Sequence, residues 1–161
     1  MGSGKSTLGK KIAQKLDMPF YDLDAFIENQ ENKSISSIFE SQGEEAFREM
    51  ETKYLKQLIK NEVLAVIALG GGTLAFNNTI ELIKSAGLLI YIELPPAALI
   101  KRLKASRDSR PLLKFISENE LPEFIHQLLD ERKKFYEQAH LKIRGINLKP
   151  ENLIHEIKSL L

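Results

Sequence analysis

The sequence predicts an α/β fold in which an open parallel β-sheet carries helices on both faces. Short apolar strand candidates alternate with helical segments, which is the pattern of successive β-α units. Residues 63–69 (VLAVIAL) and 88–94 (LLIYIEL) are almost wholly apolar, as expected of strands covered on both faces. A glycine-rich run near the first residue leads straight into a helical pattern. With 161 residues, one domain spanning residues 1–161 is expected.

Two strand candidates and three helices are expected in the first part of the chain. Leu8, Ile12 and Leu16 recur every four residues, which is typical of a helix. Gly43 separates two later helical segments, and Ser36 is a candidate N-cap for the first of them. In chain order we expect a helix at 6–16, a strand at 18–23, helices at 34–39 and 44–60, and a strand at 63–69.

Prolines and polar residues delimit the elements of the second part. Pro95 and Pro96 end an apolar strand and begin a helix, and a polar stretch over 105–110 precedes Pro111. In chain order we expect a helix at 79–85, a strand at 88–94, helices at 96–104 and 122–139, a strand at 141–144, and a helix at 150–161.

Composition excludes several functional classes. The formal net charge of +1 argues against a nucleic-acid or membrane-surface partner attracted by bulk charge. The chain has no cysteine, so disulfides, thiolate metal sites and a cysteine nucleophile are excluded. No apolar run approaches the roughly 18 residues that span a bilayer. Without a secretory signal before the glycine-rich run, a cytoplasmic protein is expected.

The run Gly2-Ser3-Gly4-Lys5-Ser6-Thr7 predicts a phosphate-binding loop. Glycines let backbone N–H groups turn toward phosphate oxygens, and the following helix adds its positive N-terminal end. Lys5 would reach the β- and γ-phosphates, and Ser6 would place a hydroxyl on Mg²⁺. The alternative is a flexible Gly/Ser-rich terminus. Because such a loop normally follows a strand and the full motif starts earlier, we expect a further apolar strand ahead of it.

Two aspartates follow the strand candidate at residues 18–23. Open α/β sheets bind ligands at the carboxyl ends of their strands, so Asp22 and Asp24 are candidates for an active site. One carboxylate would hold Mg²⁺, usually through water, and the other would accept the proton of an attacking hydroxyl. The alternative is a polar turn with an aspartate helix cap.

Several other residues are candidates for an active site, but none of them is a strong indication by itself. Arg48 and Arg132 lie among acidic neighbours on expected helices, and each alone would be a solvated surface residue. Gly70-Gly71-Gly72 after a buried strand indicates close approach of the backbone by another group. The basic residues between 101 and 110 are usually a solvated face, but a lid that carries an arginine to a phosphoryl group has the same pattern.

Together these residues resemble the shikimate kinase family over essentially the whole chain. The most specific part is Arg48-x-x-Glu51, followed by the strand before Gly70-Gly71-Gly72. Asp22-Leu23-Asp24, Arg110-Pro111-Leu112-Leu113 and Arg132 fall at matching places. The resemblance implies a three-layer P-loop NTPase fold with a five-stranded parallel sheet of order 2-3-1-4-5. The central first strand of that sheet is absent from this chain, which we therefore expect to be poorly stable or inactive alone.

The resemblance also implies the reaction and the residues that carry it. The reaction is phosphorylation of the 3-hydroxyl of shikimate by ATP with Mg²⁺, in the route to chorismate and the aromatic amino acids. Shikimate-binding helices would lie around residues 24–60 and a lid around 105–118. Lys5, Asp24 and Arg110 would be catalytic. Shikimate would be held by Asp24, Arg48, Gly70, Gly71, Gly72 and Arg132; ATP by Gly2, Ser3, Gly4, Lys5, Ser6, Thr7, Arg102 and Arg110; and Mg²⁺ by Ser6 and Asp22.

The resemblance also bears on the adenine site, the oligomeric state and the alternative functions. The segment 147–150 would form part of the adenine site, although Leu148 and Lys149 stand where the family often has an arginine. The family resemblance implies a monomer. The alternative functions are a gluconate or nucleoside monophosphate kinase, against which the triple glycine and the Asp-x-Asp argue, and a nucleotide-binding module without catalysis.

Overall fold

The computed structural model describes residues 2–105, 113 and 116–160. Most of the predicted lid around residues 105–118, including Arg110, therefore lies outside the described residues. The elements are α1 (Lys5–Leu16), β1 (Phe20–Asp22), α2 (Leu23–Glu31), α3 (Ile35–Asn61), β2 (Val66–Ala68), the 3₁₀ turn η1 (Thr73–Ala75), α4 (Thr79–Ala86), β3 (Ile90–Glu93), α5 (Pro96–Lys104), α6 (Leu121–Tyr136), β4 (Leu141–Arg144) and α7 (Pro150–Leu160).

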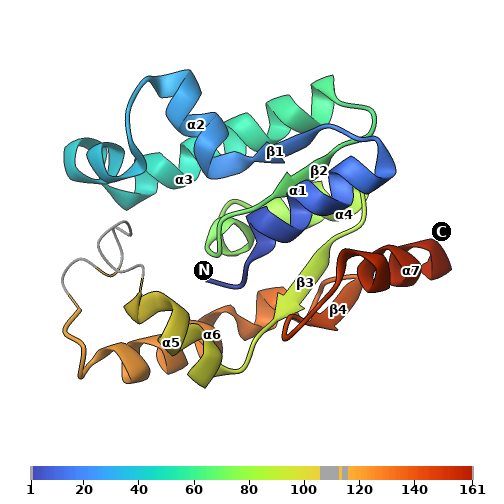
Figure 1. The fold of residues 1–161 in the computed structure, drawn as a ribbon. Coiled ribbons are helices and arrows are strands. Elements are labelled where there is room, and N and C mark those ends of the chain that lie inside the picture. Colours follow the sequence, from blue (N-terminus) through green and yellow to red (C-terminus); the bar gives the residue numbers. More distant parts are fainter. Residues whose placement is uncertain (1, 106–112, 114–115, 161) are drawn as a thin grey trace.

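The strands form two parallel pairs (Figure 1). β1 pairs with β2, so that Tyr21 lies opposite Ile67. β3 pairs with β4, so that Tyr91 lies opposite Lys142. These pairs correspond to strands 2–3 and 4–5 of the predicted order, which confirms the parallel α/β class. Within the described residues no ladder joins β2 to β3, and the predicted central strand has no counterpart there.

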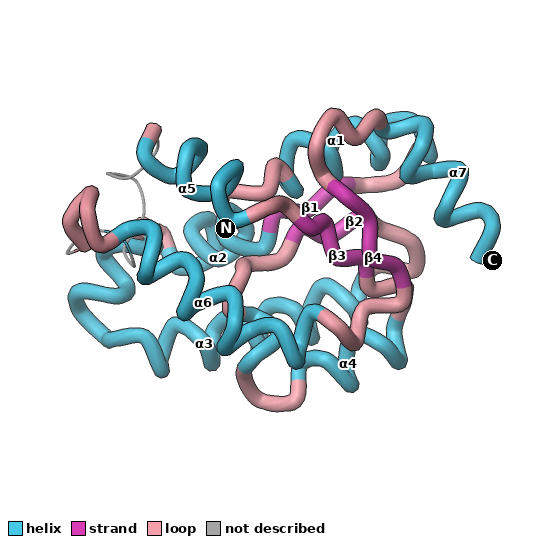
Figure 2. Tube along the Cα trace, turned by 90° about the horizontal axis from the view of Figure 1, so that it is seen from below, coloured by secondary structure: helices cyan, strands magenta, loops and turns pink. Residues whose placement is uncertain are grey.

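Helices cover both sides of the strand pairs (Figures 1 and 2). α2 and α3 pack together on the side of β1, around a cluster of buried side chains that includes Leu23, Ile27, Ile38 and Leu55. α5 and α6 pack beside the end of β3, around a second cluster that includes Leu99, Leu103, Leu121 and Ile125. α1 contacts β1, β2 and α7, so the helix after the glycine-rich run packs against both strands of the first pair.

α1 packs unusually close to the sheet because of one small residue. Ile12 and Ala13 turn its apolar face inward and are 5% and 2% exposed. A Cβ on Gly9 would lie only 2.7 Å from the ring of Phe20, on the adjoining strand β1. The glycine therefore lets the helix approach β1 directly, and this contact fixes where the loop before the helix lies.

The residue pattern did not predict α2, although the resemblance implies helices around residues 24–60. Asp22 ends β1 and caps α2, because its carboxylate accepts a hydrogen bond from the Ala25 N–H at 3.4 Å. Asp24 is consequently in the first turn of a helix rather than in a loop beyond a strand. Asp22 is thus a helix cap, and its predicted role at a metal stays a prediction.

Two other local expectations are wrong. Ser34, not Ser36, caps α3, since its side chain accepts a hydrogen bond from the Ser37 N–H at 3.2 Å. The segment 63–69 pairs only over Val66–Ala68, and Val63 is 97% exposed. Pairing starts where the Val66 N–H reaches the Pro19 carbonyl at 2.9 Å, so the apolar residues before it extend past the ladder. The predicted break at Gly43 is confirmed as a kink in α3, with φ 83°.

No helix of the described residues is long and apolar enough to cross a membrane.

Candidate functional site

The glycine-rich run forms a tight loop at the start of α1. Gly2 and Gly4 have φ of 71° and 85°, in the left-handed region that favours glycine. Gly4 is the N-cap residue, and α1 begins at Lys5. From α5, the Arg102 Nη1 donates a hydrogen bond to the Gly2 carbonyl at 3.2 Å. A helix N-terminus, a lysine and an arginine therefore meet at one loop, which is the chemistry of an anion site.

Ser6 and Asp22 are in direct contact beside this loop. The Ser6 hydroxyl, in the first turn of α1, donates a hydrogen bond to the Asp22 Oδ2 at the end of β1. The two oxygen ligands that the sequence predicts for Mg²⁺ are thus side by side. The described residues contain no group of three or more His, Cys, Asp or Glu that could hold a metal. A pair of protein oxygens suits Mg²⁺, which usually takes one or two carboxylates together with phosphates and water.

Asp24 lies at the same edge of the sheet and is half-buried. Burial raises the pKa of its carboxyl above the usual 3.8, while the nearby charge of Lys5 acts in the opposite direction. The neighbouring carboxylate of Asp22 also raises the pKa, and Arg48 lowers it. A Cβ on Gly70 would lie 3.4 Å from the Asp24 Oδ1. The aspartate therefore faces Gly70-Gly71-Gly72, the glycine run that follows β2. A carboxyl with a raised pKa in such a position is a candidate general base.

Arg48 belongs to a network within α3 rather than to a solvated surface. It is 7% exposed, and its Nη1 donates to the Glu51 Oε2 at 2.5 Å. The Thr73 hydroxyl donates to the other carboxylate oxygen of Glu51, also at 2.5 Å. Burial raises the pKa of Glu51, and the charge of Arg48 and these hydrogen bonds oppose that shift. Glu51 is 1% exposed and joins the arginine to the turn after the glycine run.

The remaining edge of the Arg48 guanidinium is paired with a second carboxylate. The Nε and Nη2 atoms donate to the Glu44 Oε1 at 3.2 and 2.8 Å. The side chain of Glu44 is 53% exposed, unlike that of Glu51. Arg48 is therefore held on one side by a buried partner and on the other side by a solvent-exposed one.

The glycines after β2 allow close approach by the side chains of this network. A Cβ on Gly72 would lie 2.5–2.7 Å from three atoms of the Arg48 guanidinium. A Cβ on Gly70 would lie 2.6 Å from the Glu51 Oε1. The sequence predicted a close approach here without naming the approaching group, and the structure identifies it as the side chains of α3.

Arg48 and Arg132 line the same cleft although they are far apart in sequence. The cleft has a volume of about 530 Å³, and its walls come from α3, the segment after β2, and α6. Its polar lining includes Glu44, Glu45, Arg48, Glu131 and Arg132. Two guanidinium groups at one cleft suit a carboxylate ligand.

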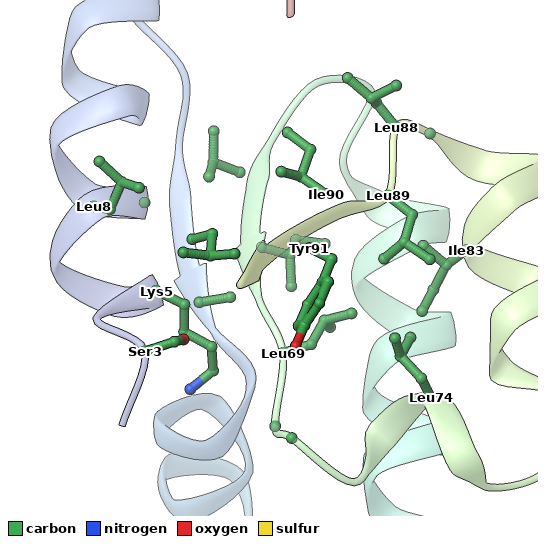
Figure 3. Close-up of a pocket in the computed structure, with 18 of the residues that line it drawn as sticks. Ser3, Lys5, Leu8, Leu69, Leu74, Ile83, Leu88, Leu89, Ile90 and Tyr91 are labelled. Carbon is green, nitrogen blue, oxygen red and sulfur yellow. The ribbon is translucent and has the colours of Figure 1, made fainter. Parts of the chain in front are cut away.

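A second cavity of about 540 Å³ runs between the two strand pairs. Its walls are mainly apolar residues of α1, β2 and β3, and Figure 3 shows Leu8, Leu69 and Ile90 among them. Ser3 and Lys5 line its wall on the side of the phosphate loop. Because Gly70, Gly71 and Arg132 also line it, this cavity connects the loop with the glycine run and α6.

Two residues of the site were not predicted to have a role there. The motif that contains Glu51 assigns it no role, although its spacing of three from Arg48 on a helix indicates an ion pair. The sequence assigns no role to Tyr136, yet its hydroxyl donates to the Gly71 carbonyl at 2.6 Å.

Two predicted parts of the nucleotide site stay predictions. Arg110 lies outside the described residues. The segment 147–150 leads into α7, and the predicted adenine contact there stays a prediction.

Known proteins resemble the chain over its whole length. The family model described as "Shikimate kinase" matches residues 1–161. A shikimate kinase of Parabacteroides distasonis is 36% identical over 161 residues, which cover all of this chain and 92% of that protein. A shikimate kinase of a Sulfurihydrogenibium species is 40% identical over 157 residues, covering 98% of this chain and 90% of that one.

Solved structures show the same similarity. The crystal structure of shikimate kinase from Bacteroides thetaiotaomicron has a TM-score of 0.89 and 35% identity, over 99% of this chain and 93% of that chain. Shikimate kinase from Acinetobacter baumannii in complex with shikimate has a TM-score of 0.88 and 32% identity, over 99% of this chain and 87% of that chain.

Proposed function

The chain belongs to the shikimate kinase family, and from that membership we propose that it transfers the γ-phosphoryl group of ATP to the 3-hydroxyl of shikimate. The products are shikimate 3-phosphate and ADP. The observation that carries this proposal is the position of Asp24, between the loop of Lys5 and the glycine run that Arg48 approaches. In this proposal the phosphate-binding loop binds ATP, the Asp24 carboxylate accepts the proton of the shikimate hydroxyl, and the two arginines bind the carboxylate of shikimate.

On the nucleotide side, the loop from Gly2 to Thr7 would bind the phosphates. Its backbone N–H groups and the N-terminus of α1 supply partial positive charge, and Lys5 supplies a full charge. Ser6 and Asp22 would hold Mg²⁺ because their oxygens already meet beside the loop. When bound, Mg²⁺ neutralises charge on the β- and γ-phosphates. From the family resemblance, Arg110 would approach the same phosphates, and Arg102 would lie against the adenine.

On the acceptor side, Arg48 and Arg132 would bind the carboxylate of shikimate through their guanidinium groups. The Nε–Nη2 edge of Arg48 is paired with Glu44, so the substrate carboxylate would take the place of Glu44 there. The backbone of Gly70, Gly71 and Gly72 would complete the pocket. Asp24 would bind the reacting hydroxyl, align it with the phosphoryl group and accept its proton.

The test is the release of ADP from ATP in the presence of each acceptor in turn. With an apolar strand restored ahead of the phosphate-binding loop, we expect rapid release with shikimate and only background release with gluconate or AMP. Release with gluconate but not with shikimate would contradict the proposed substrate. Binding of ATP without release of ADP with any acceptor, even after the first strand is restored, would instead support a nucleotide-binding module without catalysis. Size-exclusion chromatography with light scattering would test the monomer that the family implies.

A further inference from the structure

Tyr136 connects two parts of the site that come from distant parts of the chain. It is the last residue of α6, and its hydroxyl donates to the carbonyl of Gly71 at 2.6 Å. Its ring stacks on that of Tyr91 in β3, with centroids 4.6 Å apart and an angle of 18° between the rings. The stacked ring fixes the side chain, and the hydrogen bond fixes the end of α6 against the glycine run.

Arg132 lies four residues before Tyr136, so the two side chains project from the same face of α6. Arg132 lines the cleft beside Arg48 and Gly72, whereas Tyr136 holds the adjacent Gly71. The position of the Arg132 guanidinium relative to the glycine run therefore depends on how firmly this turn of α6 is attached to Gly71.

We propose that Tyr136 is a positioning residue for the acceptor. Its hydroxyl ties α6 to Gly71 and so holds Arg132 at the distance from Arg48 that suits the carboxylate of the substrate. This inference rests on the proposed function and adds to it a residue that has no contact of its own with the acceptor. Small displacements matter here, because a bidentate contact between a guanidinium and a carboxylate needs both groups in one orientation.

The first test is Tyr136→Phe, which removes the hydroxyl and keeps the ring stack. A hydrogen bond contributes about 0.5–1.5 kcal/mol, so we expect the KM for shikimate to rise about two- to twelvefold. The KM for ATP and kcat should stay within about twofold, because the phosphate loop and Asp24 are unchanged. Tyr91→Phe is the matched control: it removes a hydroxyl from the other ring of the stack and should leave the KM for shikimate unchanged.

A purely structural role would give a different result. Loss of stability lowers the fraction of folded enzyme, which reduces the apparent kcat and leaves both KM values unchanged. Thermal unfolding of Tyr136→Phe, measured in parallel, shows how much stability the hydroxyl contributes. Equal changes of the two KM values, or an unchanged KM for shikimate, would overturn the proposal.

A double-mutant cycle shows whether Tyr136 acts through Arg132. Arg132→Ala should raise the KM for shikimate strongly and leave that for ATP nearly unchanged. Adding Tyr136→Phe to Arg132→Ala should then raise the KM for shikimate less than about twofold further. Additive effects would mean that Tyr136 acts elsewhere and would overturn the assigned role. If no ADP is released with shikimate even when an apolar strand precedes the phosphate-binding loop, the proposed function itself fails, and the inference fails with it.

Discussion

Asp24 is subject to two opposing influences. Burial raises the pKa of its carboxyl, and the positive charge of Lys5 opposes that increase. A buried carboxylate is costly unless cations or hydrogen bonds stabilise it. The proposed reaction nevertheless needs the charged form, because only the carboxylate accepts a proton from the acceptor hydroxyl. Asp24 is therefore a residue at which the function and the stability of the free protein conflict.

Replacing Asp24 by asparagine should separate these two effects. We expect kcat of Asp24→Asn to fall about 10²- to 10⁴-fold, the range for loss of a general base. The stabilising contribution of a carboxyl with a raised pKa is complete below its unfolded-state pKa, and it is lost as pH rises through the folded-state pKa. The melting temperature of Asp24→Asn relative to wild type should therefore increase with pH from about 4 upward and then level off.

Thermal unfolding of both proteins between about pH 4 and pH 8 is the measurement. Asp17→Asn, at the exposed C-cap of α1, is a suitable control for the removal of an aspartate. If the difference in melting temperature between Asp24→Asn and wild type does not change with pH, folding does not raise the pKa of Asp24 and the prediction is wrong.

Glu44 stands where the proposed substrate carboxylate would bind Arg48. An exposed ion pair contributes about 0–1 kcal/mol, so Glu44→Gln should lower the KM for shikimate up to about fivefold. Glu45→Gln is the matched control, since it removes the same charge from the same cleft. Steady-state kinetics at varied shikimate checks both variants. A higher KM for Glu44→Gln would mean that Glu44 instead holds Arg48 in its binding orientation.

At the scale of elements, α3 and the turn after β2 form one unit. Glu51 bonds both Arg48 and Thr73, and the glycines leave the space that these side chains occupy. The helix carries the arginine, and the turn carries the backbone against which it lies. A change in the turn should therefore be transmitted to the arginine.

Gly72→Ala tests this coupling. Gly72 has φ −99° and ψ −12°, which alanine adopts without strain, so the effect would come from the new methyl group alone. The methyl would lie 2.5 Å from the Arg48 Nη2 and would displace the guanidinium. We expect the KM for shikimate to rise about tenfold or more, the loss that follows when a positioned group is moved.

Gly87→Ala is the control for this substitution. A Cβ at Gly87 would have no described atom within 4 Å, and its φ of 177° is extended. Its kinetics should match those of wild type. A KM for shikimate that is unchanged in Gly72→Ala would show that Arg48 is not held by the turn.

At the scale of the whole molecule, the strand pairs are separated by an apolar cavity. β2 and β3 line it from opposite sides, and α1 lies against it (Figures 1 and 3). An extended segment between them would complete a five-stranded parallel sheet of the predicted order and would bond to both strands. The site depends on this arrangement, because Lys5 lies at one wall of the cavity and Arg132 also lines it.

Adding an extended apolar segment of about six residues ahead of Gly2 should therefore stabilise the protein. Two new ladders and the filled cavity should raise the melting temperature by about 5–10 °C. A Gly/Ser segment of the same length is the control, because it lacks the side chains that fill the cavity. Equal melting temperatures for the two extended proteins would contradict this prediction.

The local elements were largely predictable because their signals lie within a few residues. The spacing of Leu8, Ile12 and Leu16 predicts α1, and Pro96 marks the start of α5 as observed. The residue pattern missed α2, which only the resemblance implied, because Asp22 ends a strand and caps a helix without any residue between them. The length of β2 also escaped prediction, because only pairing with β1 decides where the ladder begins.

The sequence by itself determined the parallel α/β class and the family, because these depend on short motifs in a fixed order. The tertiary structure decided which side chains meet. Thr73 reaches Glu51 across 22 residues, and Tyr136 reaches Gly71 across 65. Arg48 and Arg132 line one cleft only because α3 and α6 both border it. Spacing along the chain does not encode such distances, since they arise from packing between elements and not from local hydrogen bonding.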